Sequence, residues 1–303
     1  MSRQAETWLA PERGNHAVMV VMLFLARILG RRVLSHLIWP ISLYYLASDG
    51  TARRGSYMYL CRVLGRKPTW PERWRHIHAY ALTVLDRIFI LGSQKSVPPY
   101  TVQGSEVIFA ALSKGKGCIL LGAHVGSFDA LRSVGRFAAC KIRLRVLMYR
   151  RFVGAASKAI EQLDPEYENA IIHIGEPQTM LHVAEALHQG DVVAILGDRA
   201  PDMGRYASVP VLGKDAPLPV GPLRLAAITG APVVLFSALR CRDGSYDIRF
   251  EPFAEHITLE GTRTEQAQTL KAWLVRYAAW LELLCRRDPF SWFNFYDFWK
   301  ERS

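Results

Sequence analysis

From about Tyr100 onward, short apolar runs of strand length alternate with amphipathic stretches of helical length. The predicted strands are Cys118–Gly122, Leu144–Tyr149, Ala170–Ile174, Val192–Leu196 and Pro232–Ala238, with Tyr246–Phe250 as an edge strand. The predicted helices are Glu106–Ser113, Phe128–Ala139, Val153–Leu163, Pro177–His188, Pro219–Ile228 and Thr264–Arg287. Such alternation is typical of βαβ units, so we expect an α/β fold with a mostly parallel central sheet flanked by helices.

The chain has 303 residues, half of them hydrophobic, which suffices for one large domain and a smaller appendage. We expect a helical region at residues 1–68 and the α/β domain at residues 69–303. The five cysteines are scattered without a C-x-x-C pair, a pattern typical of reduced thiols in a cytosolic compartment. Because the histidines lack metal-ligand spacing and no nucleotide fingerprint is present, we expect no metal and no resident cofactor.

The net charge of +11 is concentrated at the beginning of the chain, where residues 1–100 hold 14 Lys and Arg against 5 Asp and Glu. These basic residues are interleaved with long aliphatic side chains, and no DNA- or RNA-reading motif is present. We therefore expect a membrane surface or an acidic carrier protein as partner, and no nucleic acid.

Two apolar runs, Ala17–Ala26 and Val33–Ala47, lie within this basic region, and Pro40 is expected to end or kink a helix there. Neither run alone reaches the roughly 20 residues that span a bilayer. Three interpretations remain open: a helical hairpin lying at the membrane interface, a single tilted span, and a buried amphipathic helix of a soluble protein.

The strongest chemical signal is a histidine that directly follows the predicted strand Cys118–Gly122. In the segment GAHVGSFD, His124 emerges at the carboxyl end of a strand that is apolar on both sides, where sites of α/β folds form. Gly122 and Gly126 permit a tight turn, and Asp129 falls in the first turn of the next helix. We expect Asp129 to fold back and orient His124, which then acts as a general base on a hydroxyl.

No serine or cysteine nucleophile elbow is present, which favours direct attack on a thioester over a covalent acyl-enzyme. The alternative for His124 and Asp129 is a structural hydrogen bond without catalysis.

GAHVGSFD resembles the active-site motif of the lysophospholipid acyltransferase superfamily, in particular the branch of the lipid A lauroyl and myristoyl acyltransferases. The resemblance covers Val102–Leu239 and includes Tyr149-Arg150-Arg151, ILGDRAPDMGR and VPVLGKDAPLPVGPLRLAAITGAPVV. It implies a glycerolipid-acyltransferase-like fold and transfer of a fatty acyl group from acyl carrier protein or coenzyme A to a lipid hydroxyl. It also implies a location on the cytoplasmic face of a bacterial inner membrane. The implied substrate-binding residues are Gly126, Ser127, Arg150, Asp198, Arg199 and Arg205. Of these, Arg199 and Arg205 are candidates to hold a phosphate or stabilise negative charge, and Asp198 is a candidate orienting residue.

Two departures bear on the acceptor. The lipid A enzymes usually carry Glu where this chain has Asp129, and the F-P-E-G-T-R block of the glycerolipid enzymes is absent. The aromatic tail FSWFNFYDFW is similar to a subgroup of predicted acyltransferases linked to aryl-polyene pathways. The acceptor therefore stays open among lipid A, glycerolipid, amino-lipid and aryl-polyene compounds. A catalytically silent membrane-binding scaffold is the alternative from another class.

Overall fold

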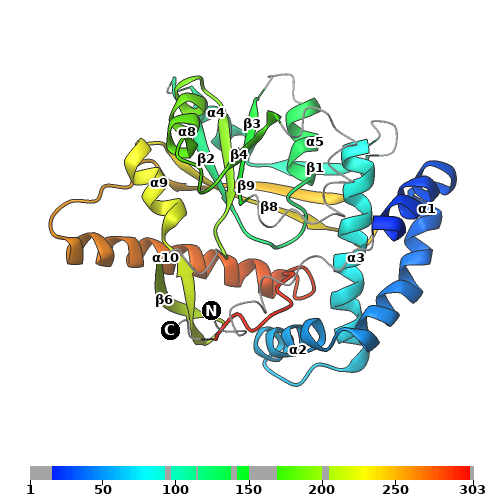
Figure 1. Cartoon of the computed structure of the whole chain (residues 1–303). Helices are drawn as coiled ribbons and strands as arrows, with labels where there is room; N and C mark the ends of the chain where they lie inside the picture. Colours follow the sequence, from blue (N-terminus) through cyan, green and yellow to red (C-terminus); the bar gives the residue numbers. More distant parts are fainter. Residues whose placement is uncertain are drawn as a thin grey trace.

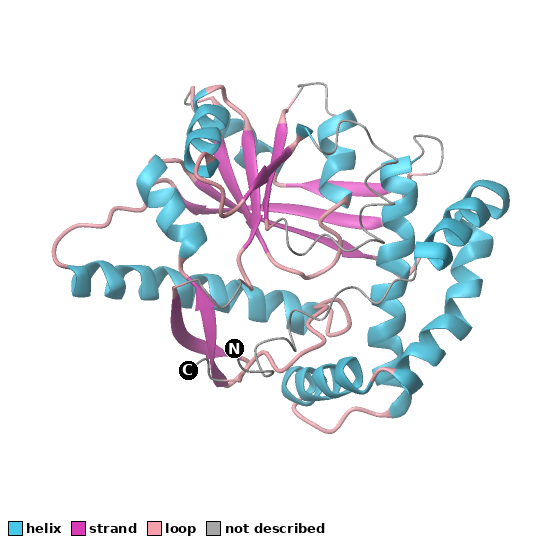
Figure 2. Ribbon diagram, in the orientation of Figure 1, coloured by secondary structure: helices cyan, strands magenta, loops and turns pink. Residues whose placement is uncertain are grey.

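The computed structural model describes residues 16–92, 97–113, 115–137, 142–149, 169–199 and 205–300 (Figure 1). A central sheet carries helices on both faces, and the helices nearest the N-terminus stand at one side of it (Figure 2). The predicted α/β class with a mostly parallel sheet is confirmed, whereas the predicted helix Val153–Leu163 lies outside the described residues.

Seven strands form the central sheet in the order β1-β9-β8-β2-β5-β3-β4. Their bounds are β1 Tyr100–Gln103, β2 Cys118–Gly122, β3 Leu144–Met148, β4 Ile171–His173, β5 Val192–Leu196, β8 Val233–Arg240 and β9 Tyr246–Ala254. Neighbouring strands run parallel, except β8 and β9, which are antiparallel. The predicted β2 and β5 agree with the structure at both ends, and these two strands lie side by side.

The predicted edge position of Tyr246–Phe250 is wrong. Strand β9 lies inside the sheet, because the short strand β1 pairs with its outer side from Tyr100↔Tyr246 to Gln103↔Arg249. Sequence reasoning missed β1, which has only four residues and alternates between partly buried and exposed positions. A short edge strand of this kind protects the longer β9 from pairing with another chain.

Alternate residues of the central strands form two separate cores. Ile119, Leu121 and Val193 face one layer, while Cys118 and Leu120 face the other. The first layer contains α8 (Thr179–His188), α9 (Gly221–Thr229), α10 (Arg263–Arg287) and the C-terminal aromatic residues, and the second contains α4 (Ser105–Leu112) and α5 (Ala130–Phe137). Burial on both faces explains why these strands are continuously apolar in the sequence.

A separate hairpin, β6 (Tyr206–Val211) and β7 (Lys214–Pro219), was not predicted. Proline is rare inside sheets because it lacks a backbone N–H, but a two-stranded ribbon has free edges on which proline is tolerated. Leu212 and Gly213 connect the strands with φ of 49° and 77°, the left-handed conformations that a two-residue hairpin turn requires.

The N-terminal helices are α1 (His16–Ser48), α2 (Gly50–Leu64) and α3 (Trp70–Gly92). Helix α1 is interrupted at Gly30, where φ is 70°, and continues through Pro40. Pro40 therefore does not end the helix, and a kink at Pro40 stays a prediction. Leu34 and Ile38 of α1 pack against Leu85 of α3. The expected domain boundary after residue 68 stays a prediction.

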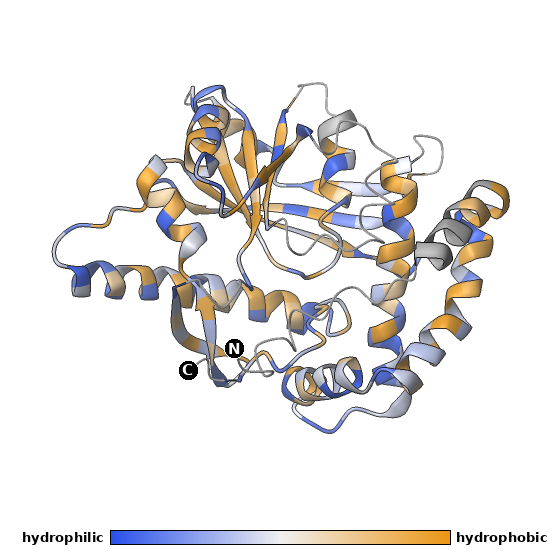
Figure 3. Cartoon of the chain, in the orientation of Figure 1, coloured by the Kyte–Doolittle hydropathy of each residue, from blue (hydrophilic) through white to orange (hydrophobic). Residues whose placement is uncertain are grey.

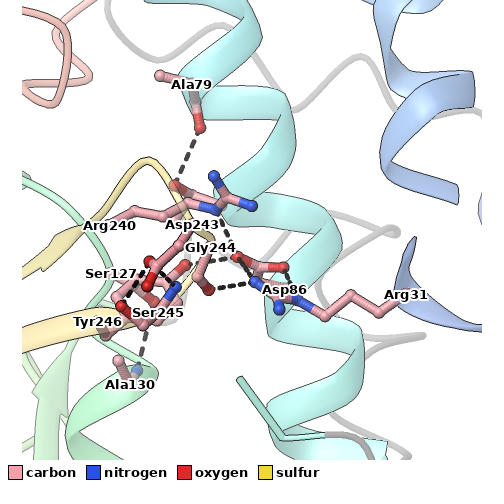
Figure 4. Close-up of polar contacts among 11 residues, drawn as sticks. Arg31, Ala79, Asp86, Ser127, Ala130, Arg240, Asp243, Gly244, Ser245 and Tyr246 are labelled. Atoms are coloured by element: carbon pink, nitrogen blue, oxygen red, sulfur yellow. Dashed lines mark hydrogen bonds and ion pairs between the residues drawn. The ribbon is translucent and has the colours of Figure 1, made fainter. Parts of the chain in front are cut away.

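A buried carboxylate, Asp86 of α3, fastens α1 to the sheet (Figure 4). Arg31 Nε of α1 lies 2.7 Å from one carboxylate oxygen, and Arg240 Nε of β8 lies 2.8 Å from the other. The Tyr246 hydroxyl donates to the same carboxylate at 3.0 Å, and Arg31 also donates to the Gly244 carbonyl. Removing one partner of such a buried group typically costs about 3–5 kcal/mol, so this cluster firmly sets the position of α1.

Away from α3, helix α1 presents apolar side chains outward, and Figure 3 shows much of this helix as hydrophobic. Its exposed apolar residues are Phe24, Ile28, Leu29, Val33, Leu37, Trp39, Leu43, Tyr44 and Tyr45. In the described part of the chain, no helix combines the length and hydropathy that crossing a bilayer requires.

Candidate active site

The candidate site lies at the carboxyl end of the two central strands β2 and β5. These strands are parallel, and Gly122 at the end of β2 pairs with Leu196 at the end of β5. His124 follows β2 by two residues and Asp198 follows β5 by two residues. Equal offsets from parallel strands in register bring both side chains to the same edge of the sheet.

His124 and Asp198 are joined by two hydrogen bonds. His124 Nδ1 lies 2.7 Å from Asp198 Oδ1, and the backbone N–H of His124 donates to the same oxygen at 3.1 Å. Asp198 is fully buried, and its other oxygen accepts from the indole N–H of Trp292 at 2.9 Å. A carboxylate at Nδ1 fixes the imidazole tautomer with the proton on Nδ1, which leaves Nε2 with a free lone pair.

The His124 side chain is 32% exposed, and its Nε2 has no hydrogen-bond partner among the described residues. Burial lowers the pKa of His124 below its usual value, and the positive charge of Arg199 acts in the same direction, whereas Asp198 opposes both. Burial alone would raise the pKa of Asp198, but His124, Arg199 and Trp292 together lower it well below its usual value. A neutral imidazole beside an ionised carboxylate is the resting state that a general base requires.

The loop after His124 is held from both sides. Phe293 N–H donates to the His124 carbonyl at 2.9 Å, and Gly126 N–H donates to the Ser291 carbonyl at 2.8 Å. On the other side, Ser127 N–H donates to the Ala238 carbonyl of β8 at 2.9 Å. Gly126 has a φ of 75°, and a Cβ at this position would lie 2.0 Å from the Ala238 oxygen. Only glycine therefore fits this turn without distortion.

The C-terminal segment that holds this loop is itself held by the N-terminal helices. The Trp292 carbonyl lies 2.9 Å from Nε2 of His76 in α3, and Nδ1 of His76 lies 2.9 Å from the hydroxyl of Ser56 in α2. Burial lowers the pKa of His76 to about 4, so the ring is neutral at pH 7. Since a carbonyl only accepts, His76 donates from Nε2 and accepts from Ser56. A continuous chain of hydrogen bonds thus links α2 and α3 to the buried Asp198.

Asp129, the predicted partner of His124, has a different contact in the structure. Its Oδ2 lies 3.1 Å from Nε of Arg87 in α3, and its Oδ1 is buried with no hydrogen-bond partner among the described residues. The structure brings His124 together with Asp198, which the sequence indicated only as a candidate orienting residue. A role for Asp129 as the partner of His124 stays a prediction.

The other predicted site residues are spread over two places. Arg199 Nη2 donates to the Phe293 carbonyl at 3.2 Å, beside the His124 loop. The Ser127 hydroxyl is buried and accepts from Ala130 N–H at 3.3 Å, which caps α5. Arg205 lines a separate pocket, and Arg150 lies outside the described residues. The binding roles of these residues and of Gly126 stay predictions.

Sequence reasoning missed two residues that shape the site. One is Trp292, because nothing in the aromatic tail FSWFNFYDFW distinguishes it from its neighbours in the sequence. The other is Tyr277 of α10, whose hydroxyl donates to the Gly122 carbonyl at 2.8 Å and is fully buried.

In the described residues, no cluster of three or more His, Cys, Asp or Glu side chains is arranged to hold a metal ion.

A comparison with known protein families assigns the class of the whole chain. The model of the bacterial lipid A biosynthesis acyltransferases matches residues 4–301. The chain belongs to this family. No curated protein matches the sequence. The family makes the chain an acyltransferase acting on lipid, and it confirms the resemblance to the lipid A branch, while the aryl-polyene subgroup stays a prediction.

If His124 is the base of this acyltransferase, Arg199 should set the pH range in which it works. Arg199→Gln removes a positive charge that lowers the pKa of His124, so that pKa is expected to rise. Because the base must be deprotonated, the acidic limb of the kcat/KM profile should then move to higher pH. Profiles of the wild type, Arg199→Gln and the exposed control Arg242→Gln check this. An unmoved limb in Arg199→Gln would contradict the electrostatic coupling.

Proposed function

We propose that this chain transfers a fatty acyl group from an acyl thioester, carried by acyl carrier protein or coenzyme A, to a hydroxyl of a lipid acceptor. The observation that carries the proposal is the hydrogen bond of 2.7 Å between His124 Nδ1 and the buried Asp198. It orients an accessible Nε2 lone pair for proton transfer. Family membership supports the acyl transfer itself.

In the proposed reaction, His124 Nε2 takes the proton of the acceptor hydroxyl while its oxygen attacks the thioester carbonyl carbon. The new C–O bond forms a tetrahedral intermediate, and Arg199, which lies beside the His124 loop, is proposed to stabilise its negative charge. The C–S bond then breaks, and the imidazolium returns the proton to the leaving sulfur. The products are an ester and a free thiol, with no covalent acyl-enzyme.

We propose Asp198 as the residue that orients His124, because it contacts both Nδ1 and the backbone N–H of His124. Its lowered pKa keeps it ionised, so it stabilises the imidazolium as it forms. Asp129 is the alternative partner, favoured by the buried oxygen that has no hydrogen-bond partner among the described residues. Substitution of each carboxylate separates the two roles.

Thioester turnover tests the proposed reaction. The purified chain is incubated with acyl carrier protein or coenzyme A thioesters and bacterial lipid extract, and released thiol and acylated lipid are measured together. We expect both products in equal amounts, and mass spectrometry of the lipid identifies the acceptor among the lipid A, glycerolipid, amino-lipid and aryl-polyene alternatives. If no thioester is consumed with any extract, the result supports the alternative that the chain is a catalytically silent scaffold.

We also propose that α1 attaches the chain to the cytoplasmic face of the inner membrane. Ile28 and Val33 lie on its exposed apolar side, with 63% and 49% of their surface accessible. The basic N-terminal third supplies charges for anionic headgroups. Ile28→Glu with Val33→Glu should abolish flotation with vesicles of phosphatidylethanolamine and phosphatidylglycerol. The matched control is Ile228→Glu on α9, a residue that is 67% exposed. Equal flotation of both variants would refute this attachment.

A further inference from the structure

Three arginines surround one pocket that lies between the β6–β7 hairpin, α9 and α10. The pocket has a volume of about 360 Å³. Its lining residues are Arg205, Tyr206, Ala207, Val220, Arg224, Arg263, Gln266, Ala267 and Leu270. None of these residues is acidic, so the described part of the pocket wall carries only positive charge.

The arginines of this pocket also lack the ion pairs that other arginines of the chain form. Arg143 and Arg145 share the carboxylate of Asp191, and Arg31 and Arg240 share that of Asp86. Arg205, Arg224 and Arg263, by contrast, have no acidic partner among the described residues. Like charges that line one pocket repel one another, and an anion between them relieves this repulsion.

The shape and chemistry of the pocket favour a particular kind of anion. Guanidinium groups form paired hydrogen bonds with phosphate oxygens. Val220, Leu270 and Ala207 add apolar wall beside the arginines, which suits a phosphate attached to an organic chain better than a free inorganic ion. Helix α9 also begins here, and its N-cap residue Val220 offers no side-chain hydrogen bond to the first turn.

The pocket is separated from His124, but helix α10 lines the pocket and also contacts the strand end next to the His124 loop. Tyr277 of α10 binds the Gly122 carbonyl at the end of β2, next to the His124 loop. Leu270 and Arg263 precede Tyr277 on α10, and a rise of 1.5 Å per residue puts them roughly 10 and 21 Å along the helix from it. A ligand that reaches from this pocket to His124 must therefore be long, with its phosphate far from its reacting atom.

We propose that this pocket binds a phosphate group carried by one of the two substrates of the acyl transfer. Two sources have the required chemistry: the phosphate of the pantetheine arm of the thioester donor, and a phosphate of the lipid acceptor. The proposal rests on the proposed function, and it adds Arg224 and Arg263 to the substrate-binding residues.

Binding of inorganic pyrophosphate to the full chain tests the site directly. Calorimetry at constant ionic strength compares the wild type with the variant that carries Arg224→Gln and Arg263→Gln. We expect saturable binding by the wild type and about tenfold weaker binding by the variant, since charged hydrogen bonds are lost. Arg242→Gln, an exposed arginine outside the pocket, should bind as the wild type does. Equal affinities of the wild type and the pocket variant would overturn the proposal.

Kinetics distinguish the two sources. In the pocket variant, KM should rise about tenfold for the substrate that carries the phosphate, with kcat little changed. A rise for acyl-coenzyme A but not for an acyl-pantetheine without phosphate identifies the donor, and a rise for the lipid alone identifies the acceptor. If neither KM rises, the proposal is wrong. Pyrophosphate binding needs no acyl transfer, so a wild type that binds it without consuming any thioester would refute the proposed function and still support the anion site.

Discussion

His124→Gln is expected to lower kcat for acyl transfer by roughly 10²–10⁴-fold, the usual contribution of a general base. Glutamine keeps a polar side chain of similar reach, but it cannot take a proton from the acceptor hydroxyl. Because the base acts in the transition state, KM should change little. The measurement is thiol release from an acyl thioester in the presence of the lipid acceptor.

The matched control for this substitution is His256→Gln. His256 is exposed and lies outside the candidate site, so turnover should equal that of the wild type. Thermal unfolding of both variants shows whether the fold is kept. Turnover by His124→Gln within a few-fold of the wild type would rule out His124 as the base.

The second large effect is expected from Asp198→Asn. Asparagine has nearly the same shape, but its amide can donate to Nδ1, which would leave the His124 proton on Nε2 and block the base. In serine-protease catalytic triads, the same change of the carboxylate lowers kcat by about 10⁴-fold. We expect a loss approaching this size in kcat, together with loss of the acidic limb assigned to His124.

Two further variants make the result specific. Asp191→Asn removes another buried carboxylate that is paired with arginines, at the opposite end of β5, and therefore reports the general cost of such a change. Asp129→Asn tests the partner that the sequence spacing favoured. If Asp129→Asn reduces kcat as much as His124→Gln while Asp198→Asn leaves it high, Asp129 is the functional partner and the contact with Asp198 is structural.

The strands that the sequence predicts well are those with two buried faces. Cys118–Gly122 and Val192–Leu196 are apolar at every position because helices cover both sides of the sheet, so composition alone identifies them. Strand β1 and the β6–β7 hairpin escape prediction for physical reasons. The first is short and half exposed, and the second contains prolines that only its free edges tolerate.

Of the candidate site, the sequence predicts the features that are local in the chain and misses the contacts that depend on the whole fold. The position of His124 follows from one strand and its turn, which are local in the sequence. The contact with Asp198 depends on which strand lies beside β2, and its register is set by the fold as a whole. Sequence spacing favours Asp129, five residues away, over a carboxylate that is 74 residues away. Trp292 is still more distant, and its role depends on the path of the C-terminal segment.

The path of that segment has a consequence for the growing polypeptide. Residues 291–293 supply the hydrogen bonds that hold the His124 loop and the indole that binds Asp198, yet they leave the ribosome long after His124 does. A nascent chain with β2, β5 and their loops already folded still lacks these contacts. If His124 is the general base, the proposed site can therefore assemble only after residues 291–293 have been synthesised, about 170 residues after His124 itself.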